Sequence, residues 1–146
     1  MSRIVHTQGT PTTQRNRLRR TVAEALRRLM EKPAMDEEGK DLAALIVFAL
    51  REIHENIDKS ASAWEKRDYY LKADRFRREW AWIGPMERLL TNALVYKEWE
   101  ELPPLFAQLL NQFQDVTVNK LTRGPELWAG AYERLLSEQP QSRGKL

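Results

Sequence analysis

Clustered carboxylates are the residues of this chain that come nearest to a catalytic site. Glu37, Glu38 and Asp41 stand together in "EEGKD", and Glu55 and Asp58 follow in "ENID" after thirteen intervening residues. Carboxylate oxygens are preferred ligands of Mg²⁺, which also binds substrate phosphates.

The spacing of these acids looks like the EExxE...ExxD signature of the all-α nucleotide pyrophosphohydrolases of the MazG type. In that family, carboxylates on facing helices hold magnesium over a nucleoside triphosphate, so the resemblance implies such a site here. Asp41 stands where the family has Glu, and "LAALIVFALREIH" between the two groups contains no turn residue. One continuous helix would separate the groups by about 20 Å, too far for a metal whose ligands lie at about 2.1 Å. The magnesium-dependent hydrolase is therefore the third of three functional alternatives.

Other kinds of catalysis have few residues to use. The chain has no cysteine, only two histidines (His6 and His54), and no glycine-rich phosphate loop. His54 and Asp58 are spaced i, i+4, but the Glu-x-x-His motif of di-iron bundles needs Glu at position 51, where Arg51 stands. We therefore predict a protein that is not an enzyme and that has no metal and no cofactor.

Basic residues are concentrated near the N-terminus. Up to Lys32 there are eight Lys or Arg residues and two Glu, so this part has a net charge of +6, whereas the whole chain has a net charge of +3. Clustered cations can neutralise phosphates, so a nucleic-acid-binding protein is the second alternative. A solvated basic face is the competing interpretation, because Glu24 and Glu31 lie one helical turn from several arginines. The candidate nucleic-acid contacts are Arg15, Arg17, Arg19 and Arg20.

The stretch from Trp64 to Pro85, "WEKRDYYLKADRFRREWAWIGP", combines aromatic rings with arginines more densely than the rest of the chain. On a helix of about 100° per residue, its side chains form two organised faces. One face repeats at intervals of four and three residues and is expected in the core: Tyr69, Ala73, Phe76, Trp80 and Ile83. The other face has the composition of a protein interaction hot spot unless another segment of the chain covers it: Leu71, Arg75, Arg78 and Trp82.

Hydrophobic periodicity predicts an all-α fold, an irregular bundle of five or six helices in one domain. The first two helices are expected from about Thr13 to before Pro33, and from an Asp36 N-cap to roughly Lys66. Residues 42–50 are apolar all round, which predicts that this part of the second helix is central. A break near Asp68, with Asp68 capping a third helix, competes with one continuous long helix. Later boundaries are expected at three prolines: a helix resuming at Met86 after Pro85, one with Pro104 in its first turn and a last one opened by Pro125.

The overall composition agrees with a single globular domain. The chain has 146 residues, of which 42% are hydrophobic and 31% charged. We expect a flexible basic arm over residues 1–12, a helical domain over 13–138 and a disordered tail over 139–146. No stretch has the length and apolar character of a membrane span or signal peptide, so a cytoplasmic protein without membrane association is expected. The leading functional prediction is a non-catalytic protein-protein interaction or oligomerisation module, whose expected partners are other proteins and further copies of the chain.

Overall fold

The computed structural model describes residues 9–139, and the fold class predicted from the sequence is confirmed. Within those residues there is no strand. The parts of the predicted arm and tail in residues 1–8 and 140–146 lie outside the described residues. The helices are α1 (Pro11–Met30), α2 (Glu37–Lys66), α3 (Tyr70–Glu79), α4 (Ile83–Val95), α5 (Leu102–Gln112) and α6 (Ala131–Ser137), with short 3-10 helices η1 (Trp99–Glu101) and η2 (Pro125–Leu127).

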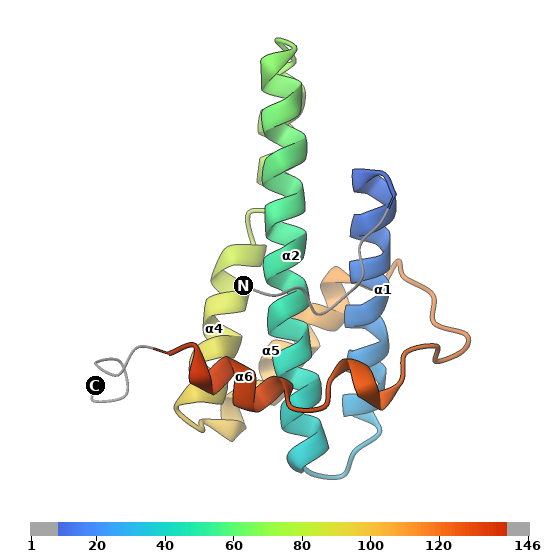
Figure 1. The fold of residues 1–146 in the computed structure, drawn as a ribbon, viewed down its shortest axis with the longest axis vertical. Coiled ribbons are helices and arrows are strands. Elements are labelled where there is room, and N and C mark those ends of the chain that lie inside the picture. The colour runs from blue at the N-terminus through green and yellow to red at the C-terminus, as the bar shows by residue number, and fades with distance from the viewer. Residues whose placement is uncertain (1–8, 140–146) are drawn as a thin grey trace.

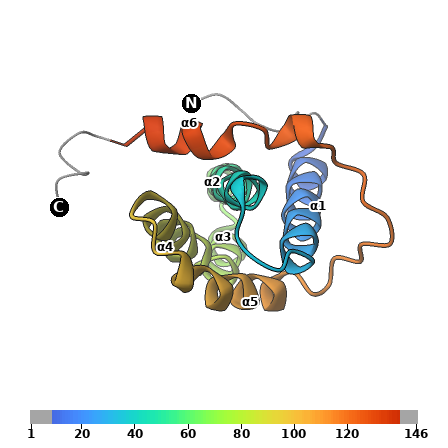
Figure 2. The same ribbon diagram turned by 90° about the horizontal axis from the view of Figure 1, so that it is seen from below.

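Helix α2 is the central element of the bundle. Viewed along its axis, it is surrounded by α1, α4 and α6, with α5 closing the side between α1 and α4 (Figure 2). Every residue from Leu42 to Leu50 is buried, as the apolar run predicts. Among the described residues, none of the helices has both the length and the hydropathy needed to cross a bilayer.

The beginnings of α1 and α2 follow from local capping. Helix α1 starts at Pro11, two residues earlier than predicted, because proline suits the first helical position and the Thr10 hydroxyl accepts a hydrogen bond from the Thr13 amide at 3.1 Å. The predicted arm therefore overlaps the helix at residues 11–12. Asp36 caps α2 as predicted, accepting from the Gly39 amide at 2.7 Å.

The predicted break between the second and third helices is present, but Asp68 does not cap α3. It adopts a left-handed conformation with φ 66° and ends α2. The amide of Tyr69 donates to the Trp64 carbonyl at 2.9 Å, and that of Asp68 donates to the Glu65 carbonyl at 3.0 Å. These two bonds form a Schellman motif, and aspartate is one of the few residues apart from glycine that adopt its left-handed position readily.

Two later boundaries differ from the prediction. Helix α4 begins at Ile83, three residues early, because Pro85 falls in the first turn, where its missing N–H costs nothing. Pro125 opens only the 3-10 helix η2, and the last α-helix starts at Ala131 after Gly130, whose φ is 77°. Asp41 in α2 accepts from the amides of Tyr132 and Gly130 at 2.9 and 3.3 Å, which fixes where α6 begins.

The central position of α2 predicts where truncation is costly. Leu50→Ala removes a fully buried side chain and is expected to lower the free energy of unfolding by about 2–5 kcal/mol. Leu71→Ala is the matched control, since Leu71 is 78% exposed, and should change that free energy by no more than about 0.5 kcal/mol. Urea unfolding followed by circular dichroism measures both; equal losses in the two variants would contradict the assignment of the core.

Candidate interaction surface

The C-terminal half of α2 and the antiparallel α3 form a helical hairpin that projects from the bundle. Figure 1 shows the upper end of α2 standing clear of α1, α4 and α6. The lengths explain the projection: α2 has 30 residues and α1 has 20, so at 1.5 Å per residue α2 is longer by about 15 Å. The bundle therefore covers only the first part of α2.

Small and aromatic side chains hold the hairpin together. Ala61 and Ala73 are fully buried, so the two helices can approach closely. Nearby, the Trp64 and Phe76 rings meet edge to face with their centroids 4.9 Å apart. Arg77 of α3 also donates to Glu65 at 3.1 Å and to Asp58, both on α2. These contacts hold α2 and α3 together as one packed unit up to the outer end of the hairpin.

Large apolar side chains are exposed at that end. Tyr69, Tyr70 and Leu71 are 49%, 61% and 78% exposed, directly after the left-handed Asp68. Lys72 lies over the Trp64 ring with its ammonium 4.4 Å from the centroid. We call the surface formed by Tyr69, Tyr70, Leu71, Lys72 and Arg75 the tip.

The structure separates the four residues predicted to form an interaction surface. Leu71, Arg75 and Arg78 lie exposed on α3, with Arg78 bound to Asp74 at 2.8 Å. Trp82 does not continue their face, because α3 ends at Glu79.

Trp82 is instead half-buried within the chain. It stacks on Trp80 at a centroid distance of 5.7 Å and meets Phe113 edge to face at 5.8 Å. The covering segment is therefore the end of α5, which contributes Phe113.

The predicted aromatic core seam is present in part. Ala73 and Ile83 are buried, and Phe76 and Trp80 pack against the core while partly exposed. Tyr69 is not in the core, since nothing from the bundle reaches the end of the hairpin. The sequence pattern gave the direction of these side chains correctly but could not indicate how far along α3 the other helices extend.

Arg15 and Arg19, two of the predicted nucleic-acid contacts, are engaged within the protein. Arg15 donates to Asn56 at 2.7 Å and lies over the Phe76 ring at 5.0 Å, and burial lowers its pKa. Arg19 donates to both carboxylate oxygens of Asp115 at 2.6 and 2.7 Å, and this hydrogen bonding lowers the pKa of Asp115. These contacts attach α1 to the base of the hairpin and to the end of α5.

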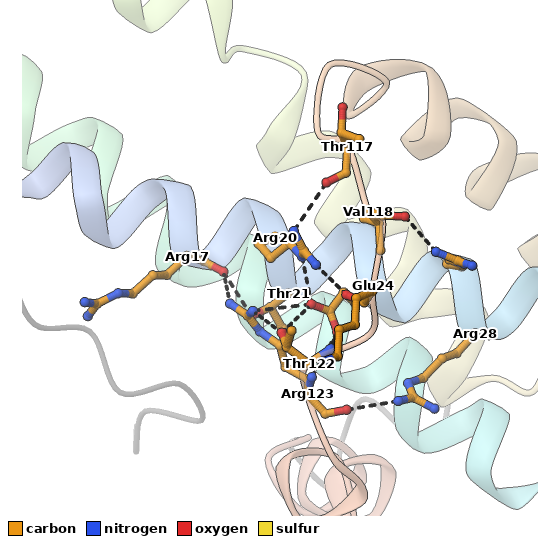
Figure 3. A network of polar contacts seen from close by, with 11 residues as sticks. Arg17, Arg20, Thr21, Glu24, Arg28, Thr117, Val118, Thr122 and Arg123 are labelled. Carbon is orange, nitrogen blue, oxygen red and sulfur yellow. Dashed lines mark hydrogen bonds and ion pairs between the residues drawn. The ribbon is translucent and has the colours of Figure 1, made fainter.

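Glu24 of α1 is the centre of a second network, shown in Figure 3. Its side chain is 1% exposed and accepts from the Thr122 amide and hydroxyl at 2.7 Å each, from the Arg123 amide at 2.9 Å and from Arg20 Nε at 2.7 Å. Burial acts to raise the pKa of Glu24, but the hydrogen bonds from Arg123, Thr122 and Arg20 outweigh it and lower the pKa to about 2. Glu24 thus remains charged while it is buried.

Other arginines of α1 bind the same connecting segment, residues 113–124, through its backbone. Arg20 donates to the carbonyls of Thr117 and Lys120, and Arg27 and Arg28 donate to those of Val118 and Arg123. Arg17 is exposed, and its own carbonyl accepts from Arg123. The sequence correctly indicated that Glu24 pairs with Arg20, but it gave no signal for these contacts across about 100 positions.

The five carboxylates that resemble a magnesium site all lie on α2, as the absence of a turn residue implies. Asp41 caps α6, Glu38 binds Lys32 at 2.8 Å, and Asp58 binds Arg77. Among residues 9–139, no group of three or more His, Asp or Glu side chains is arranged to hold a metal ion.

The sequence did not predict an apolar groove that lies between the end of α1 and the beginning of α5. Its volume is about 440 Å³, within the range of about 300–1,000 Å³ that ligand pockets occupy. Met30, outside the buried stripe of α1, is 58% exposed at its edge. We call this pocket the groove. The side chains that line it include Leu29, Met30, Pro33, Met35, Trp99 and Phe106.

The fold and this surface define an all-α bundle with a projecting helical hairpin. In comparisons with known proteins, no family model matches the chain, and neither a curated protein nor a solved structure matches it.

The Glu24 network predicts a pH dependence of stability. The folded-state pKa of about 2 lies below the ordinary value of 4.5, so the unfolded state binds the proton more readily between these values. The stabilisation is fully present above about pH 4.5 and is lost as the pH falls towards 2, and it amounts to about 3 kcal/mol.

The test is Glu24→Gln, which should lower the free energy of unfolding at pH 7 by about 1.5–3 kcal/mol and flatten its decline between pH 4.5 and 2. Glu133→Gln, at an exposed position of α6, is the control. Urea unfolding across that pH range measures both, and an unchanged slope in Glu24→Gln would be inconsistent with a buried ionised carboxylate.

Proposed function

We propose that this protein is a non-catalytic helical interaction module and that the tip of the α2–α3 hairpin binds another protein chain. The observation that supports the proposal most directly is the exposure of Tyr69, Tyr70 and Leu71 next to one another at the end of a projecting hairpin. Large apolar side chains grouped on an exposed surface are typical of protein interaction sites.

The composition of the tip suits binding. Tyrosine and arginine are enriched among the residues that contribute most to protein interfaces, and Arg75 lies on the same helix as Tyr70. Burial of a leucine such as Leu71 contributes about 1.5–3 kcal/mol. The packing of Trp64 on Phe76 and the ion pairs of Arg77 order the hairpin beforehand, so less conformational entropy is lost on association.

The other two functions considered from the sequence receive no such support. Arg15 is occupied by Asn56 of α2, and Arg19 and Arg20 by contacts that hold residues 113–124 to α1. The acidic side chains of α2 are distributed along a single helix.

Site-specific photocrosslinking tests the proposal. Benzoylphenylalanine placed at position 71 is expected to give crosslinked protein adducts on irradiation in the host cell, because this position contacts the partner. The same reagent at position 89 is the matched control, since Leu89 is 51% exposed on α4. Denaturing electrophoresis and mass spectrometry detect the adducts.

Specific binding further requires that Tyr70→Asp abolish the adducts at position 71, because a charge then replaces an apolar ring of the tip. An absence of adducts at position 71, or the same adducts at positions 71 and 89, would refute a binding role for the tip.

A further inference from the structure

The tip carries an excess of positive charge. Residues 63–78 contain six basic side chains and three acidic ones. Two of those acids are neutralised locally, Glu65 by Arg77 and Asp74 by Arg78. In the described part of the chain, none of the four remaining basic residues forms an ion pair: Lys66, Arg67, Lys72 and Arg75. A partner surface for the tip should therefore be apolar in the middle and acidic at its edge.

The groove on the same molecule has that combination. Its apolar lining includes Leu29, Trp99 and Phe106. The two chain segments that border it, residues 31–38 and 97–101, contain seven carboxylates and two lysines. One of those lysines, Lys32, is bound by Asp36 at 3.0 Å and Glu38 at 2.8 Å.

The acids at the edge of the groove are accessible. Glu31, Glu98, Glu100 and Glu101 are all exposed. Glu31 pairs with Arg27 at 3.8 Å. Among the described residues Glu98, Glu100 and Glu101 form no ion pair, so they give the edge free carboxylate charge around an apolar centre.

We propose that the partner of the tip is a second copy of this chain, whose groove receives Tyr70 and Leu71 while its acidic edge faces Lys72 and Arg75. This inference depends on the proposed function and specifies its partner. Apolar side chains that are exposed at the tip match an apolar groove that is open, and the charges around the two surfaces are opposite. The groove also has room for side chains, with its volume of about 440 Å³.

The positions of the two surfaces determine the kind of assembly. The groove lies where α1 ends and α2 begins, and the tip lies at the other end of α2 (Figure 1). Since α2 has 30 residues, these ends are about 45 Å apart, and a molecule cannot fill its own groove. The contact joins two different surfaces, so each added copy leaves one tip and one groove open. The product is an open row of molecules whose length grows with concentration.

Two exposed positions allow each surface to be disabled separately. Leu71→Gln makes the tip polar, and Met30→Lys places a positive charge at the groove, where it repels the basic tip. Leu89→Gln is the control for the loss of an exposed leucine. Because all three side chains are at least half exposed, at 78%, 58% and 51%, thermal unfolding midpoints should be unchanged, which circular dichroism verifies.

Light scattering coupled to size exclusion gives the decisive measurement. The wild type and Leu89→Gln should show a mass that rises with protein concentration and falls with added salt, as screening weakens the charge attraction. Leu71→Gln and Met30→Lys should each remain at the mass of one chain. Mixed in equal amounts, they should form a species of twice that mass and no larger, because one intact groove meets one intact tip.

Three results would overturn the inference: a wild type that stays monomeric, a mixture that stays monomeric, or a dimer that survives Met30→Lys, which would indicate contact between two tips. The photocrosslinking experiment separates this failure from that of the proposed function. Adducts at position 71 that contain a different protein, without a second copy of this chain, would leave the interaction role standing and remove self-association. The absence of any adduct would remove both.

Discussion

The burial of α2 on every side is the constraint from which the rest of the architecture follows. A helix that is apolar all round from Leu42 to Leu50 needs neighbours in all directions, and α1, α4 and α6 supply them. Beyond Ile57 the apolar positions narrow to a stripe ending in Ala61, which a single partner can cover. That partner is α3, so one helix serves both as the centre of a bundle and as one side of an exposed hairpin.

Charged side chains, rather than apolar ones, hold residues 113–124 against the bundle. Residues 113–124 connect α5 to η2 without regular structure, and their backbone groups need partners that no neighbouring strand or helix ladder provides. Glu24 supplies acceptors for the amides of Thr122 and Arg123, and the arginines of α1 supply donors for the carbonyls. The high density of arginine near the N-terminus therefore has a structural explanation, since guanidinium groups are multiple donors that tolerate partial burial.

Local patterns in the sequence predicted most of the helices, and long-range contacts account for the differences. The apolar stripe of α1, the Asp36 cap and the central run of α2 are local signals, and all are present. Asp68 was misassigned because aspartate suits both an N-cap and a left-handed helix end, and only the neighbouring geometry distinguishes them. Trp82 and the groove depend on where α5 packs, which periodicity within one helix does not encode.

Arg19 connects three parts of the molecule that are distant in sequence. Its guanidinium lies 6.0 Å from the centroid of Trp80 and 5.7 Å from that of Phe113, and Asp115 holds it by two hydrogen bonds. Trp80 directly follows α3, so the guanidinium of Arg19 contacts the base of the projecting hairpin. Because Asp115 fixes this guanidinium by two hydrogen bonds, the base of the hairpin and the end of α5 share one anchoring side chain.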